Sequence, residues 1–371
     1  MAAMVCARRL AAAGGGGARA TAAAVRHVAS MPASGARDGR WIVGSGSNVI
    51  DAFYPVRKLP APGDKTYFAA EKFLADTVVG GVTLNHLAWA RALGAPTALA
   101  ALQGEDDNGR AIRAKLASMG VGVHNVRVSP AYTTSVSHVL VEEGGERSIL
   151  MAPASTSQLT APKMAGEFAA AVAAASMITT EISQVPLSGV EVLLDGARAA
   201  GIPSMLDVDV PPSVAAGAAR LGTLEELTRC VSKARCLKVT GTAAAELLAL
   251  VSSAPLASSL EAAAAQLADA FGAALVVITD GSRGAALALA KGGAGASAER
   301  SVRVPIYPGV QQRDATGAGD AYFGGLVAAI HAWGFPTTPA AAARIGAVGA
   351  AAGAACVEVL GALPVDRIRY V

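Results

Sequence analysis

The sequence is poor in aromatic and in charged residues. Of its 371 residues, 4% are aromatic and 16% are charged. With only seven Phe and three Trp, the hydrophobic core has to be built from Leu, Val and Ile. The chain also lacks a run of about 18 or more strongly apolar residues without charges. It is therefore expected neither to span a membrane nor, given its high aliphatic content, to be disordered over most of its length.

Cysteine and histidine are scarce, and neither forms a pattern that would hold a metal ion. The four cysteines show no metal-site spacing and no disulfide framework, which favours a reducing compartment. The five histidines form no HxH or HExxH pattern, so no zinc site is predicted. The sequence also lacks the GxSxG motif of a nucleophilic serine and the Walker A lysine motif of many nucleotide-binding proteins.

Positive charge is concentrated near the N-terminus. Residues 1–37 hold five Arg and no acidic residue, and they are rich in Ala and Gly, as mitochondrial presequences are. Of the 31 basic residues in the chain, 26 remain beyond this segment against 28 acidic ones, so no nucleic-acid partner is expected. We expect residues 1–37 to be a mitochondrial leader. The alternative is a disordered tail of biased composition on a cytoplasmic protein.

Beyond the leader, over residues 38–371, short β-branched runs alternate with alanine-rich helical stretches. This alternation predicts a parallel sheet covered on both faces by helices, an α/β architecture. The predicted strands are 41–43, 97–102, 177–180, 204–208, 236–239 and 275–279. The predicted helices are 84–93, 108–119, 187–200, 243–251 and 260–271.

Two regions break this rhythm. Residues 52–77 contain three prolines among extended-looking residues, and residues 133–151 read as two strands around the turn Glu142–Glu146. We expect both regions to form a small sheet that covers one edge of the main sheet. The alternative is that they are ordinary surface excursions.

One loop in the C-terminal half combines glycines with a carboxylate and opens into an apolar helical stretch. Gly317 and Gly319 let backbone amides converge without a Cβ in the way, and the helix start adds the positive end of its dipole. The amides of Gly317, Ala318 and Gly319 could therefore bind a phosphate. Asp320 would repel a phosphate, but it could accept a proton from an attacking hydroxyl. The alternative is that Asp320 only caps the helix.

Two other glycine loops could also bind a ligand. The loop Thr279–Gly284 follows a predicted strand, so it either cradles a nucleotide phosphate or forms a simple turn with a solvated Arg283. Gly80 and Gly81 precede Asn85, which lies in the first turns of a predicted helix. The Asn85 side chain could hold a substrate hydroxyl or bond only to the backbone.

A carboxylate follows the first predicted strand. Asp51 could accept two hydrogen bonds from a vicinal diol, as a sugar-binding residue would, or lie in water as a loop residue. The nearby Gly44-Ser45-Gly46 is not a dinucleotide-binding fingerprint, because the third glycine would fall at Val49. Any nucleotide site must therefore use another geometry.

In their order and spacing, these loops resemble the ribokinase-like (PfkB) family of carbohydrate and nucleoside kinases. The resemblance runs from about Trp41 to the C-terminus. Its most specific element is the Asp-x-Thr-Gly-Ala-Gly-Asp stretch that ends at Asp320. The Gly80-Gly81 pair with Asn85, the stretch 104–110 and the loop 279–284 support it.

The resemblance implies a Rossmann-like three-layer α/β/α domain with a mainly parallel central sheet and a small β-sheet lid, built here by residues 52–77 and 133–151. It implies ATP as the phosphoryl donor and Mg²⁺ as the divalent cation, with K⁺ as a further candidate ion. Lids of this type can pair in the family, so a homodimer through the lid is a candidate assembly. The expected partner is a small-molecule sugar or nucleoside.

The resemblance also implies roles for individual residues. It makes Asp320 the catalytic base and the amides of Gly317, Ala318 and Gly319 the anion hole. The residues that match nucleotide-binding positions are Thr279, Gly281, Arg283, Gly284 and Thr316. Those that match substrate-contacting positions are Asp51, Gly80, Gly81 and Asn85.

The chain departs from the family at a motif linked to metal and phosphate positioning. Asn-x-x-Glu usually follows the strand that ends here at Val239, but this chain has Thr240-Gly241-Thr242-Ala243. Both polar groups are missing, and no metal ligand is assigned. The remaining candidates are Asp207, Asp209 and Glu246.

Three functions are compatible with these features. The first is an ATP-dependent kinase that phosphorylates a primary hydroxyl of a small sugar. The second is a nucleoside kinase, which pocket-facing apolar residues such as Phe53, Tyr67 or Phe68 would favour. The third is a catalytically weak family member with a binding or regulatory role, suggested by the missing motif and opposed by the intact turn at Asp320.

Overall fold

The computed structural model describes residues 40–69, 76–142, 146–291, 300–359 and 361–364. The expected leader, residues 1–37, lies outside the described residues, and so does the tip of the predicted hairpin at residues 143–145.

The main sheet confirms the predicted parallel architecture. In the described part of the chain it has nine strands, and the seven from β5 to β11 are parallel to their neighbours. The last two strands, β12 and β13, are antiparallel and extend one edge. In spatial order the strands are β5 (Gly122–Ser129), β4 (Thr97–Gly104), β1 (Ile42–Gly44), β8 (Met177–Ile182), β9 (Ser204–Val208), β10 (Cys236–Thr240), β11 (Leu275–Thr279), β12 (Ala285–Leu289) and β13 (Ser301–Val304).

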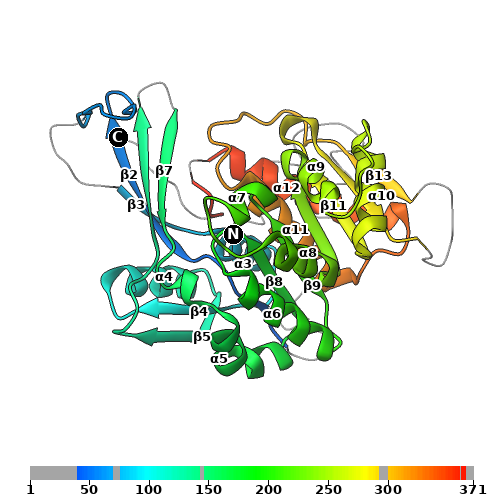
Figure 1. The fold of residues 1–371 in the computed structure, drawn as a ribbon, viewed down its shortest axis with the longest axis horizontal. Helices are drawn as coiled ribbons and strands as arrows, with labels where there is room; N and C mark the ends of the chain where they lie inside the picture. Colours follow the sequence, from blue (N-terminus) through cyan, green and yellow to red (C-terminus); the bar gives the residue numbers. More distant parts are fainter. Residues whose placement is uncertain (1–39, 70–75, 143–145, 292–299, 360, 365–371) are drawn as a thin grey trace.

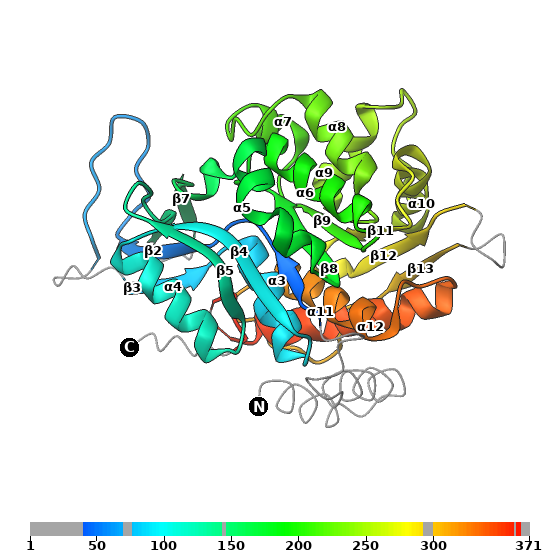
Figure 2. The ribbon, with the colours of Figure 1, turned by 90° about the horizontal axis from the view of Figure 1, so that it is seen from below.

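Helices cover both faces of this sheet, as Figure 2 shows. Alternate strand residues point into two separate cores: in β11, Leu275 and Val277 pack on one side and Val276 and Ile278 on the other. One layer consists of α3 (Val82–Ala92), α4 (Asp107–Ser118), α11 (Ala318–Trp333) and α12 (Pro339–Val357). The other consists of α5 (Ala161–Ala173), α6 (Leu187–Ala199), α8 (Leu224–Lys233), α9 (Gly241–Ala249) and α10 (Leu260–Phe271), with the short α7 (Pro212–Ala216) beside them.

A second, smaller sheet stands beside the main one (Figure 1). Its strands are β3 (Asp76–Gly80), β2 (Val49–Val56), β6 (Val136–Glu142) and β7 (Arg147–Ala152), in that spatial order. β2 pairs antiparallel with β3 and parallel with β6, and β7 closes the sheet as an antiparallel edge strand. In the chain, β2 and β3 lie between β1 and α3, whereas β6 and β7 lie between β5 and α5.

Helices α11 and α12 pack closely because glycines lie at their contact. A Cβ placed on Gly325 would be 2.9 Å from the Cα of Gly349 and 3.0 Å from the carbonyl oxygen of Val348. Among the described helices, α12 is the one long and apolar enough, by length and composition, to cross a membrane. Half of its apolar window is buried inside the molecule, and it packs on α11, β12 and β13, as the core helix of a layered fold does.

We expect Gly325→Ala to lower the free energy of unfolding by about 1–3 kcal/mol, because its Cβ would force the backbones of α11 and α12 apart. Thermal denaturation measures the effect. Gly166→Ala is the matched control, since Gly166 is exposed in α5 with nothing within 4 Å of its Cβ position. It should raise the free energy of unfolding by about 0.5–1 kcal/mol. Equal stability of the two variants would contradict the proposed packing.

Candidate active site

The candidate site lies at the carboxyl ends of the parallel strands. The chain leaves β1 at Gly44, β8 at Ile182, β9 at Val208 and β10 at Thr240, all on the same edge of the sheet. Open α/β sheets bind their ligands at this edge. The N-terminus of α11, with the glycine turn before it, supplies the side chain of Asp320 to the same region.

Asp320 lies in the first turn of α11 and is buried, with 8% of its surface exposed. Its Oδ2 accepts a hydrogen bond of 2.8 Å from Nδ2 of Asn85 on α3. The helix begins at Ala318, and its N-cap residue is Gly317, so Asp320 does not cap the helix as the alternative had it. The side chain of Asn85 thus bonds to Asp320 and not only to the backbone. Its Oδ1 is buried without a partner among the described residues.

The turn before α11 requires glycine at position 317. Gly317 has a φ of 72°, and a Cβ there would lie 2.3 Å from the Cβ of Ala362. The expectation of three free amides holds only in part, because the Ala318 amide donates to the Ala315 carbonyl at 3.2 Å. Among the described residues, the amides of Gly317 and Gly319 have no hydrogen-bond acceptor. Two donors of the turn are therefore available to an anion.

Glu181 on β8 fixes the loop after β1 and the start of α3. Its side chain is buried and accepts hydrogen bonds from the amides of Ser47 at 2.8 Å and Thr83 at 2.9 Å, as well as from the Thr83 hydroxyl. Because Asn85 lies half a turn after Thr83, Glu181 sets the position from which Asn85 reaches Asp320.

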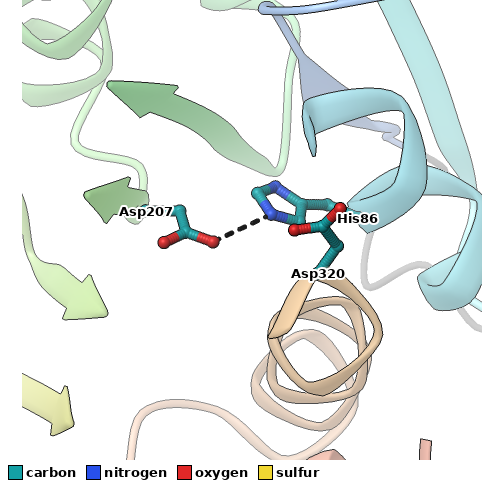
Figure 3. A group of neighbouring side chains, drawn as sticks. All are labelled: His86, Asp207 and Asp320. Carbon is teal, nitrogen blue, oxygen red and sulfur yellow. Dashed lines mark hydrogen bonds and ion pairs between the residues drawn. The ribbon is translucent and has the colours of Figure 1, made fainter. Parts of the chain in front are cut away.

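A buried group of charged side chains lies close to Asp320 and the turn before α11. Oδ2 of Asp207 on β9 accepts a hydrogen bond of 2.8 Å from Lys238 on β10 and lies 3.2 Å from Nε2 of His86 on α3. His86, Asp207 and Asp320 each have one ligand-type atom within 4.8 Å of the others (Figure 3). Sequence reasoning had not joined His86 or Lys238 to the site, although a lysine inside an apolar strand is itself an unusual feature.

The charges in this group shift one another's pKa values. Burial tends to raise the pKa of Asp207, but Lys238 and His86 outweigh it and lower that pKa. Burial, with Asp320 and Asp207 nearby, raises the pKa of Asp209 to about 8. Burial also raises the pKa of Asp320, and His86 and Lys238 oppose that rise. At neutral pH, Asp207 is therefore ionised and Asp209 is mostly protonated.

None of the three candidate metal ligands is disposed to hold a divalent cation directly. Asp207 is already paired with the ammonium of Lys238, which would repel a metal ion. Asp209 is mostly protonated at neutral pH. Glu246 on α9 accepts a hydrogen bond from the Ser213 amide at 2.9 Å, at the start of α7. These three carboxyl groups thus do not fit a protein-held Mg²⁺ site.

The predicted substrate residues lie together at the junction of the two sheets. The Cβ position of Gly80 is only 2.4 Å from Oδ2 of Asp51, and Gly81 has a φ of 115° at the start of α3. Asp51 bonds with Ser137 on β6 and is close enough to Asp320 and Arg147 for their charges to act on it. Burial raises its pKa to about 6, Ser137 lowers it, Asp320 raises it and Arg147 lowers it.

The loop predicted to bind a nucleotide is an exposed turn between β11 and the antiparallel β12. The Asp280 amide donates to the Gly284 carbonyl at 2.8 Å, and Arg283 pairs with Asp280 at 2.7 Å. Gly281 and Gly284 both have positive φ, and Thr279 ends β11 with its hydroxyl bonded to Val239. The loop lies at the same sheet edge as Asp320, and its role in nucleotide binding stays a prediction.

Arg147 links the smaller sheet to the glycine turn. It begins β7, and its guanidinium donates to the hydroxyl of Thr316, one residue before Gly317. Its charge also lowers the pKa values of Asp51 and Asp314. Sequence reasoning missed Arg147, because its partner lies 169 residues further along the chain.

The comparisons with known proteins agree with this geometry. The model of the pfkB family of carbohydrate kinases matches residues 50–366. No curated protein matches the chain.

Solved structures share the fold. Arabidopsis thaliana ribokinase, complexed with ribose and ATP, is 22% identical with a TM-score of 0.69, over 88% of this chain and 95% of its own. Ribokinase from Cryptococcus neoformans in complex with ADP is 22% identical with a TM-score of 0.65, over 87% and 95%. The nucleoside kinase of Methanocaldococcus jannaschii is 17% identical with a TM-score of 0.62, over 87% and 93%.

The pKa of Asp51 predicts a pH-dependent affinity for ligands with vicinal hydroxyls. Only the ionised carboxylate accepts hydrogen bonds from both hydroxyls, so the Kd of a bound sugar or nucleoside should rise about tenfold as the pH falls through about 6. Calorimetric titration at several pH values measures this. Asp51→Asn should bind weakly at every pH, with the dependence flattened. A wild-type Kd that stays constant across this range would refute the role of Asp51.

Proposed function

Because the chain belongs to the pfkB family of carbohydrate kinases, we propose that it transfers the γ-phosphoryl group of ATP to a primary hydroxyl of a small sugar. One observation carries the proposal. Asp320 is buried in the first turn of α11, is held by Asn85, and lies one residue after Gly319 and three after Gly317, whose amides have no acceptor among the described residues. A carboxylate and an anion-binding turn are thus combined in one place.

In the proposed reaction, Asp320 accepts the proton of the attacking hydroxyl as its oxygen bonds to the γ-phosphorus of ATP. The bond from that phosphorus to the bridging oxygen breaks, and ADP leaves. The amides of Gly317 and Gly319 stabilise the negative charge on the transferred group. Asp51 and the unpartnered Oδ1 of Asn85 are acceptors that would orient the sugar hydroxyls. Positioning and charge stabilisation supply most of the catalysis of phosphoryl transfer. The groups named here are of the types that these two effects require.

We propose that ATP lies along the sheet edge, with its phosphates at the turn before α11 and the loop 279–284 beside it. Mg²⁺ would enter bound to the ATP phosphates, since it keeps several waters and needs few protein ligands. A K⁺ requirement stays a prediction.

The smaller sheet is proposed to close over the sugar and exclude water, with the Arg147–Thr316 contact joining it to the turn. Its edge strand β7 exposes Ile149, Leu150 and Met151 by about half, which supports the proposed homodimer through this sheet.

A nucleoside is the second candidate acceptor, and the register of the smaller sheet favours it. Phe53 lies on the same face as Asp51, since strand residues alternate. Its partner in β6 is Val139, whose own partner in β7 is Ile149. This apolar row beside the diol-binding carboxylate could pack against a base.

A screen of ATP consumption across pentoses, hexoses and nucleosides tests the proposal. We expect turnover with at least one sugar or nucleoside. Asp320→Asn should lower kcat by about 10²- to 10⁴-fold, the range that loss of a general base produces. Asp195→Asn, on the outer face of α6, is the matched control and should keep full turnover.

Comparable turnover in wild type and Asp320→Asn would refute the role of Asp320. Absence of turnover with every acceptor would refute the kinase assignment and favour a binding or regulatory role.

For the N-terminal segment we propose mitochondrial targeting, supported by its five Arg and its lack of acidic residues. A fluorescent reporter fused behind residues 1–37 should accumulate in mitochondria. Diffuse cytosolic fluorescence would show this prediction to be wrong.

A further inference from the structure

Lys238 occupies an unusual position for a lysine. It is the middle residue of β10 and only 1% of its surface is exposed. Among the described residues, its ammonium has one hydrogen-bond partner, Oδ2 of Asp207 at 2.8 Å. An ammonium has three N–H donors, so two remain for other groups. Burying a charge costs free energy unless the charge is paired and hydrogen-bonded. The two remaining donors of Lys238 therefore point to a role beyond its bond to Asp207.

The ammonium lies against the first turn of α11. A Cβ placed on Gly319 would be 3.2 Å from Nζ of Lys238, so the backbone beside Asp320 is in near contact with the charge. An alanine at position 319 would press on the ammonium. Gly319 is thus the residue that lets Lys238 approach the turn.

Several titratable groups surround Asp320, and Asp209 among them is mostly protonated at neutral pH. The charged and titratable groups that act on it are His86 of α3, Asp207 of β9, Asp209 after β9, Lys238 of β10, Asp51 of β2 and Cys356 of α12. Lys238 is the permanent cation among them, since its pKa is raised by Asp207, Asp209 and Asp320 despite its burial. A phosphoryl group at the turn would add further negative charge.

The turn after β10 adds no charge of its own. The Thr240 hydroxyl bonds to the Thr242 hydroxyl at 3.0 Å and accepts from the Ala243 amide at 3.3 Å, so it serves to cap α9. The positive charge on this strand therefore comes from Lys238.

We propose that Lys238 is a positioning residue for phosphoryl transfer: its ammonium, anchored by Asp207 beside Gly319, offsets the negative charge of Asp320 and of the phosphoryl group at the turn. The inference rests on the proposed kinase function. It assigns to one strand residue the electrostatic support that keeps the carboxylate of Asp320 ready to accept a proton.

The simpler explanation is that Lys238 only neutralises the buried Asp207. The two explanations differ for the charge-neutral double variant Asp207→Asn with Lys238→Met. If Lys238 served only Asp207, removing both charges would restore function, because a buried pair can be replaced as a unit. If Lys238 supports Asp320, the double variant stays impaired.

The experiment compares kcat and KM, over a range of pH, for the wild type, Lys238→Met, Lys238→Arg and the double variant, each with its melting temperature. We expect Lys238→Met and the double variant to lose about 10- to 10³-fold in kcat with a smaller change in sugar KM. Because loss of a nearby cation raises the pKa of a carboxyl, the acidic limb of kcat/KM should move up by about one pH unit in Lys238→Met, and by less in the double variant, which also loses the negative charge of Asp207. Lys238→Arg restores the charge and should recover part of the activity.

Lys233→Met is the matched control. Lys233 forms its ion pairs with Glu191 and Asp195 on the outer face of α6, so its loss should leave kcat and the pH profile unchanged. A folded double variant with wild-type kcat and pH profile would overturn the proposal.

A second readout does not depend on activity. Infrared difference spectroscopy of the free protein follows the protonated carboxyl band of Asp320, identified by its loss in Asp320→Asn. The band should persist to higher pH in Lys238→Met than in the wild type. The shift should be smaller in the double variant, because Asp207→Asn removes a negative charge that itself raises the pKa of Asp320. An unshifted band would overturn the role of Lys238 whether or not the kinase assignment holds, while a wild type that turns over no acceptor would bear on the kinase assignment alone.

Discussion

The hydrogen bond between Asn85 and Asp320 is the interaction on which the candidate site depends. It joins α3, which follows β3 of the smaller sheet, to α11, which follows the glycine turn at Gly317. The two helices pack closely, since a Cβ on Gly324 would lie 2.7 Å from the Cβ of Trp89 and 2.8 Å from the carbonyl oxygen of His86. Groups that would bind the acceptor and the transferred phosphoryl are thereby brought together by one buried contact.

The small residues of this protein make a buried polar site possible in an aliphatic fold. Glycines at 324 and 325 let α11 approach α3 on one side and α12 on the other. Within this close packing, Asp207, Lys238 and His86 satisfy part of one another's charge, which is what allows ionisable groups to remain buried. The close packing of the helices at small residues and the buried cluster of charged side chains therefore depend on each other.

The sequence was sufficient to predict the parallel sheet, because apolar runs such as 204–208 and 275–279 are strands buried on both faces. It was insufficient for β5, whose residues are mixed and half exposed, and for α12, whose alanine and glycine content hides its periodicity. Helix α8 did carry a usable signal, since Thr223 and Glu226 form a capping box before an amphipathic stretch.

The residues of the candidate site also differ in how far the sequence could predict them. Asp320 and Gly317 lie in one short motif, so local spacing identified them. The pairing of Lys238 with Asp207 and of His86 with Asp207 spans 31 and 121 residues, and such distances are set by topology rather than by any local pattern.

The connection between the smaller sheet and α3 is very short. β3 ends at Gly80 and α3 begins at Val82, with Gly81 alone between them. No spacer can absorb a rotation of the sheet, so any such rotation pivots at Gly81 and swings the first turn of α3, where Asn85 lies. A movement of the smaller sheet would in this way also move Asn85 and, through its hydrogen bond, the carboxylate of Asp320.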